Sequence, residues 1–138
     1  MTRIVSHLVR ALAWSIVAAI LVQLYFAGAF IFGVLGVHFH RALGVNLFFA
    51  ALLTALLSLT TRETRARWAW HFGVVGSMIV QGELLRMRAY VPAVAALHAV
   101  NAVVVLLVAH QAARRAAVAP AARRAARASR PSLQVRVA

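Results

Sequence analysis

The sequence of 138 residues contains no cysteine, no lysine and no aspartate, and it carries two acidic residues against 15 arginines. Without cysteine, the chain cannot form disulfides, zinc–thiolate sites, cysteine-ligated iron–sulfur clusters or a thiol nucleophile. Without aspartate and lysine it also lacks the paired carboxylates of hydrolases and a phosphate loop of the Gly-x-x-x-x-Gly-Lys type. Conventional hydrolase or transferase chemistry therefore has no residues to carry it, and we do not expect an enzyme.

Apolar residues dominate what remains. They make up 64% of the chain, charged residues make up 12%, and the mean hydropathy is +0.86. A soluble domain is nearer half apolar and a quarter charged. A chain this short could not cover so much apolar surface against water. The net charge of +13 is also typical of nucleic-acid binders, but the apolar fraction argues against a soluble one, so we expect an integral membrane protein and no nucleic-acid partner.

Four stretches with little charge predict four transmembrane helices, because a span needs about 20 apolar residues. They cover about residues 11–33, 38–61, 68–85 and 91–113. The first stretch is far longer than the apolar core of a cleaved signal peptide, roughly 7–15 residues, so we expect it to be retained. Since the connections are short, the predicted fold class is all-α: an integral membrane four-helix bundle in up-down-up-down order, made of two repeated helical pairs and occupying residues 1–113.

The arginines predict the orientation. Twelve fall on the side of both termini, and three, Arg41, Arg86 and Arg88, fall on the other side. The positive-inside rule therefore predicts a bacterial inner-membrane protein with both termini in the cytoplasm. Residues 114–138 form an Arg/Ala-rich tail that we expect to be disordered and attracted to anionic lipid headgroups. Nucleic-acid binding by the tail is the alternative, which the absence of aromatic residues in it disfavours.

The two halves of the chain repeat at an offset of 58 residues. Gln23 and His40 correspond to Gln81 and His98, so glutamine and histidine are 17 residues apart in each half. Small residues accompany them, and such stripes let transmembrane helices approach closely while an amide hydrogen-bonds across the interface. Any close-packed bundle shows small residues, but packing does not explain the matched histidines. The stripes are Ala11, Ser15, Ala19 and Ala27; Ala69, Gly73 and Ser77; Gly44, Ala51 and Ala55; and Ala102, Ala109 and Ala113.

His40 and His98 are candidate ligands for a b-type haem. Two imidazoles from facing helices supply the two axial nitrogens of a bis-histidine haem, and the apolar bundle excludes water from the ring. Gly44 and Ala102, one turn beyond each histidine, would leave space for the macrocycle. His40 is expected several ångströms nearer the outer surface than His98, which lies six residues beyond Pro92.

Three outer arginines complete the candidate haem site. Arg41, Arg86 and Arg88 could pair with the haem propionates, which are anionic.

Each of these residues also has a simpler interpretation. His40 would be interfacial, and His98 would hydrogen-bond to Gln23, Gln81 or Asn101 in a polar core without a cofactor. Glu83 would form an ion pair with Arg86, Arg88 or Arg41, rather than act as a proton relay. His7, His71 and His110 lie near predicted helix ends on the cytoplasmic side, where a wet imidazole needs no special explanation.

The stretch His40-Arg41-Ala42-Leu43-Gly44, followed by an apolar helix, resembles the second helix of the haem A synthase family. Val80-Gln81-Gly82 through Leu97-His98 resembles that family's third and fourth helices. The resemblance covers about residues 10–113 and implies one four-helix unit with His40 and His98 as axial ligands. Val37 stands where the synthase motif has a glutamate, and the cysteine pair of its first outer loop is absent, so synthase chemistry is not implied.

The chain resembles still more closely a family of small four-helix membrane proteins of unknown function found mainly in actinobacteria. Its members share the patterns His-Arg-x-Leu-Gly and Leu-His-x-x-Asn-Ala, here residues 40–44 and 97–102. This resemblance implies no established activity.

Three functions remain. The first is a haem-binding protein for electron transfer or haem handling, with ligands His40 and His98. The second is an accessory bundle without a cofactor, which packs in a larger membrane complex or self-associates. A small transporter or channel ranks last, because many transporters have broken helices and the predicted spans are uninterrupted.

Overall fold

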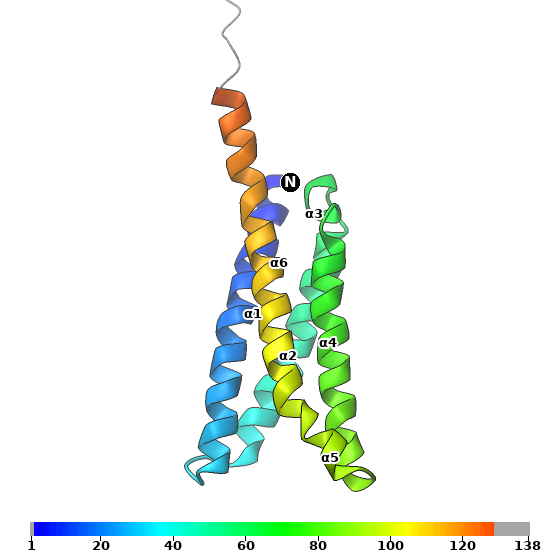
Figure 1. Cartoon of the computed structure of the whole chain (residues 1–138). Coiled ribbons are helices and arrows are strands. Elements are labelled where there is room, and N and C mark those ends of the chain that lie inside the picture. Colours follow the sequence, from blue (N-terminus) through cyan, green and yellow to red (C-terminus); the bar gives the residue numbers. More distant parts are fainter. Residues whose placement is uncertain (1, 129–138) are drawn as a thin grey trace, which may run out of the picture.

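The structure is a computed structural model that describes the backbone of residues 2–128 and the side chains of residues 3–62 and 64–116. The described chain consists of helices and turns, without a strand, which confirms the predicted all-α class. Figure 1 shows four long helices joined by shorter elements. The long helices are α1 (Thr2–Ile31), α2 (Val37–Ser58), α4 (Trp68–Arg86) and α6 (Leu97–Ala128), and the short ones are α3 (Arg62–Arg65), η1 (Met87–Ala89) and α5 (Pro92–Ala95).

Each long helix packs mainly against two others. α1 lies along α2 and α6, and α4 lies along α6 and α2, so α2 and α6 stand diagonally across the bundle. Figure 1 shows the α1–α2 turn and α5 at one end of the molecule, which we call the hairpin end (residues 32–36 and 87–96). The start of α1 and α3 lie at the opposite end, the N-terminal end. Because α2 and α6 both begin at the hairpin end, their first turns are brought to the same level.

Three helical segments are long and apolar enough to cross a membrane: Arg3–Ile31, Val37–Ser58 and Pro92–Ala116. These segments cover three of the four predicted spans. α4 has 19 residues but does not belong to this group. Its glutamine, glutamate, arginine and histidine side chains lower its mean hydropathy relative to the other three.

The turn between α1 and α2 is made possible by a glycine. α1 ends at Ile31, and Gly33 follows with φ of +72°, a left-handed conformation in which a side chain is strained. The amide of Val34 then bonds to the carbonyl oxygen of Ala29 at 2.7 Å, which satisfies a terminal carbonyl of α1. The chain reverses within five residues, so α1 and α2 form a close hairpin.

The fourth predicted helix is interrupted. Pro92 occupies the first turn of α5, as expected for a residue without an amide hydrogen, but α5 ends at Ala95 and α6 begins anew at Leu97. α6 then continues to Ala128, beyond the predicted end at residue 113, so it occupies the first part of the predicted tail. Residues 129–138, where the predicted disordered tail ends, lie outside the described residues.

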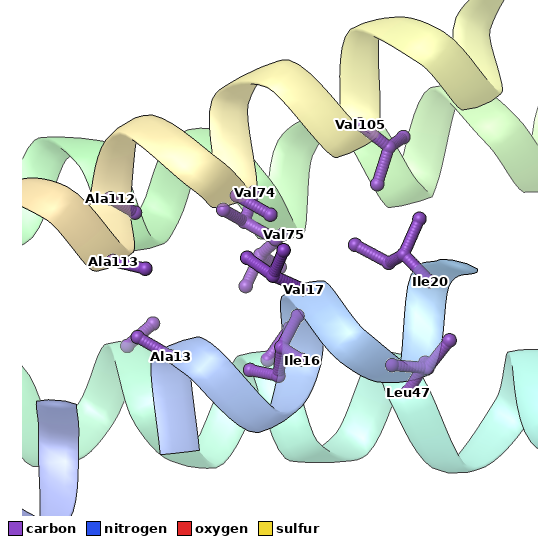
Figure 2. Packing of buried hydrophobic residues seen from close by; sticks show 13 residues of the cluster. Ala13, Ile16, Val17, Ile20, Leu47, Val74, Val75, Val105, Ala112 and Ala113 are labelled. Carbon is purple, nitrogen blue, oxygen red and sulfur yellow. The ribbon is translucent and has the colours of Figure 1, made fainter. Parts of the chain in front are cut away.

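The buried core fills only the N-terminal half of the bundle. Figure 2 shows residues of α1 meeting residues of α2, α4 and α6 in this half. Across residues 21–46 and 76–104, which form the hairpin half, Ala29 is the one buried side chain. The bundle is therefore tightly packed at one end and loosely packed at the other. The core cluster comprises Ala13, Ile16, Val17, Ile20, Leu47, Ala51, Ala55, Val74, Val75, Val105, Ala109, Ala112 and Ala113.

The predicted small-residue stripes face the interior on α2 and α6 but not on the N-terminal half of α1. Ala55 and Ala113 are fully buried, whereas Ala11 and Ser15 are exposed. Each residue of an α-helix turns by about 100°, so a run of i, i+4 steps drifts by roughly 40° per step around the axis. The α1 stripe that passes through Gln23 has therefore turned away from the interior by the time it reaches Ala11.

Candidate functional site

The two matched histidines face each other across the bundle. His40 lies in the first turn of α2, and His98 lies in the first turn of α6, directly after the helix break at Ala96. Their ring centroids are 6.4 Å apart and the ring planes meet at 61°. The expected difference in depth therefore does not separate the rings, because the break places His98 near the start of a helix, as His40 is.

A pair of reciprocal hydrogen bonds ties each histidine to the glutamine of its own hairpin. The Gln23 side-chain amide Nε2 donates to the carbonyl oxygen of His40 at 2.8 Å, and His40 Nδ1 lies 3.3 Å from the carbonyl oxygen of Gln23. The second hairpin repeats this arrangement, with distances of 2.9 Å from Gln81 Nε2 to the carbonyl of His98 and 2.9 Å from His98 Nδ1 to the carbonyl of Gln81. We call each reciprocal pair a clasp.

The clasps fix the protonation pattern of both imidazoles. A carbonyl oxygen only accepts hydrogen bonds, so Nδ1 of each ring must carry the proton that it donates. In the neutral imidazole, Nε2 then keeps its lone pair. A ligand histidine in a metal site has this arrangement, in which the non-ligating N–H is held by a carbonyl that sets the tautomer and the ring orientation.

The separation of the rings fits two ligands of one metal. Bonds from imidazole nitrogen to metal are about 2.0 Å long, so two rings on opposite sides of one ion have centroids about 6 Å apart. The observed distance is 6.4 Å. In the part of the chain that the structure describes, no group of three or more His, Cys, Asp or Glu side chains gathers to hold a metal by itself. Two imidazoles alone suit a haem, because the porphyrin supplies the other four nitrogens.

The two clasps differ in how their glutamines are supported. Asn101 Nδ2 donates to Gln81 Oε1 at 2.7 Å and to the carbonyl oxygen of Ser77 at 2.9 Å. In the first hairpin, Gln23 Oε1 is buried and accepts no hydrogen bond. Leu43 occupies the position that corresponds to Asn101, so the first half has no side chain to complete the network.

Gly44 and Ser77, both predicted as residues of the packed polar core, lie beside the two clasps. We expected Gly44 to leave space for a macrocycle, but a Cβ on Gly44 would stand 3.0 Å from Gln23 Nε2. Gly44 therefore makes room for the amide of the first clasp. Ser77 contributes its backbone carbonyl to the polar network, and its hydroxyl donates to the carbonyl oxygen of Val74 at 2.9 Å.

The charged residues of the hairpin end are exposed. Among the alternatives for Glu83, the structure selects Arg86, whose guanidinium lies 3.3 Å from the carboxylate; the side chains are 78% exposed for Arg86 and 55% for Glu83. Arg41 directly follows His40, and Arg88 lies in η1, both with exposed side chains. The three arginines are thus at the end of the bundle where the histidines lie.

His71 and His110 lie apart from the site. His71 was expected to be wet, but it is only 4% exposed, because the first turn of α4 packs against α2 and α6. It lines a cavity of about 10 Å³ together with Thr54, a space the size of one water molecule. His110 packs edge-on against Trp14, with ring centroids 5.8 Å apart.

Comparisons of the chain with protein-family models, with curated proteins and with solved structures give no match. Function is therefore inferred from the geometry of the clasps.

The unequal support of the two glutamines predicts unequal effects of removing them. Gln81→Leu removes a donor to His98 and the acceptor of Asn101, and one hydrogen bond in a membrane bundle contributes roughly 0.6–1.7 kcal/mol, so we expect a loss of about 1–3 kcal/mol. Gln23→Leu removes one hydrogen bond together with an unpaired buried oxygen, and we expect a loss below about 1 kcal/mol. Reversible unfolding in mixed micelles measures both. Equal losses, or a larger loss for Gln23→Leu, would contradict the asymmetry.

Proposed function

We propose that this protein is a multi-pass protein of a bacterial inner membrane that binds one b-type haem through His40 and His98, for electron transfer or haem handling. The observation that carries the proposal is the pair of diagonal imidazoles, each held at Nδ1 by a backbone carbonyl and separated by 6.4 Å. The four long helices would cross the membrane in up-down-up-down order, with both termini in the cytoplasm.

The placement in the membrane is supported by composition and by residues at the N-terminal end. Three helical segments are apolar enough to span, and α4 completes the bundle by packing on α2 and α6. At the N-terminal end, the guanidinium of Arg115 lies 4.5 Å from the ring centre of Trp70, a cation–π contact suited to a membrane interface. With the arginines around α3 and in the tail, this end would face anionic headgroups on the cytoplasmic side.

When bound, a haem supplies reversible one-electron exchange at its iron. The residues of this chain would hold and insulate it. Nε2 of His40 and of His98 would be the two ligand atoms, and the clasps would hold both rings in the tautomer that leaves these atoms unprotonated. The loose packing of the hairpin half would let the helices accommodate a macrocycle with little loss of buried contact. Arg41 and Arg88 would pair with propionates, while Arg86 already contacts Glu83.

The proposal predicts the spectra of histidine variants. Full-length protein produced with ample haem should show a Soret band and the sharp reduced-minus-oxidised bands of a six-coordinate b-type haem. His98→Ala and the double variant with His40→Ala should lose the six-coordinate spectrum, because each removes an axial nitrogen. His110→Ala is the control, since that ring packs on Trp14 and should leave the spectrum unchanged.

Absence of a Soret band in the wild-type protein would refute haem binding, and an unchanged spectrum in the double variant would refute these ligands.

A second candidate is an accessory bundle without a cofactor, and the outer face of α4 favours it. Ala69 and Gly76 are exposed on this face, and a Cβ on Gly76 would meet nothing within 4 Å. α4 is also the long helix that is not among the three segments apolar enough to span a membrane. A small-residue face on such a helix is suited to packing against a helix of another chain or of a second copy.

This candidate predicts that Gly76→Leu disrupts assembly. The added side chain would fill the shallow face and keep a partner helix away, whereas Ala18→Leu on the exposed side of α1 should not. Native mass measurement of the protein extracted in mild detergent or nanodiscs distinguishes these variants. Recovery of the wild-type protein as a monomer alone would remove the support for an accessory bundle.

A further inference from the structure

We propose that the two histidines are unequal ligands: His98 is the fixed one and His40 is exchangeable, so that a small neutral ligand can take the place of the His40 imidazole. This inference rests on the proposed haem binding. It follows from differences between two clasps that occupy equivalent positions in the repeat.

The clasp of His98 is a closed network. Its Nδ1 lies 2.9 Å from the carbonyl of Gln81, and the Gln81 side chain uses both its nitrogen and its oxygen. Asn101 connects that oxygen to the carbonyl of Ser77. Moving the first turn of α6, and His98 with it, away from α4 would break bonds that run to two successive turns of α4.

The clasp of His40 is open. Its Nδ1 lies 3.3 Å from the carbonyl of Gln23, a longer and weaker contact than its counterpart. Gln23 Oε1 is buried without a donor, which is unfavourable in a dry interior. Releasing the Gln23 amide breaks one side-chain hydrogen bond, whereas releasing the Gln81 amide breaks two, so the clasp of His40 opens at a lower cost than the clasp of His98.

The segments that precede the two histidines also differ, and the one before His40 gives less support than the one before His98. α2 begins directly after a turn that contains Gly33 and Gly36. Between this turn and α2 there is no additional short helix that could support the first turn of α2. α6 is preceded by α5, which packs against η1 and α4. The first turn of α6 is therefore anchored on both sides, while that of α2 can move with its glycine-containing turn.

These differences define the class of ligand. With a haem bound, the exchange would replace the bond from His40 Nε2 by one bond to the incoming ligand, without a change in oxidation state. His40 is partly buried in the first turn of a largely apolar helix, so the loss of hydration would disfavour a charged ligand there. A neutral diatomic molecule fits, and carbon monoxide is the probe.

The experiment compares full-length, haem-loaded protein with two variants that exchange the residues at equivalent positions. Leu43→Asn gives Gln23 Oε1 the donor that Asn101 gives Gln81, so carbon monoxide affinity of the reduced protein should fall by about threefold to twentyfold, the range that one membrane hydrogen bond provides. Asn101→Leu should not lower it. Gln23→Leu, which removes the side-chain half of the clasp and keeps the carbonyl that His40 Nδ1 contacts, should raise it and provides a second test if Leu43→Asn does not fold. The vibrational frequencies of bound carbon monoxide should be the same in His40→Ala as in the wild type, because His98 would be the remaining imidazole ligand in both.

Equal carbon monoxide affinity in wild type, Leu43→Asn and Gln23→Leu would overturn the inference while leaving haem binding intact, whereas absence of a haem spectrum would overturn the proposed function.

Hydrogen exchange of the haem-free protein gives a separate readout. Amides of residues 41–44 should exchange faster than those of residues 99–102, and Leu43→Asn should slow them. Equal rates in both segments would also overturn the inference.

Discussion

The reciprocal hydrogen bonds between glutamine and histidine are the constraint on which the site depends. Each clasp joins the two helices of one hairpin and fixes one imidazole, with Nδ1 bound to a carbonyl of the opposite helix. The bundle then places the two hairpins so that α2 and α6 are diagonal, and the rings meet at 6.4 Å. Local bonds thus orient each ring, and packing between hairpins brings the rings together.

The packing of the bundle differs between its two halves. Buried alanines and valines fill the N-terminal half, where the helices approach closely and where changes in side-chain volume would be costly. The hairpin half has almost no buried side chains and is held by polar contacts instead. The two imidazoles of the proposed haem site lie in this less densely packed half.

Much of this arrangement could be predicted from the sequence, and the exceptions have physical reasons. The common spacing of glutamine and histidine indicated that the two hairpins share one contact, because a repeat at constant register places equivalent residues in equivalent positions. It did not indicate that backbone carbonyls are the partners, since every residue offers one. The break at Ala96 was not predicted because alanine is a good helix former, and the burial of His71 depends on neighbours from two distant helices.

The protonation pattern of the histidines tests the account most directly. Nitrogen NMR of the haem-free protein, labelled at histidine and held in micelles, distinguishes the two neutral tautomers, and single-histidine variants assign the signals. The clasps predict that His40 and His98 both carry their proton on Nδ1 and leave Nε2 unprotonated. A proton on Nε2 of either ring would contradict the clasp at that site and remove the basis for its role as a ligand.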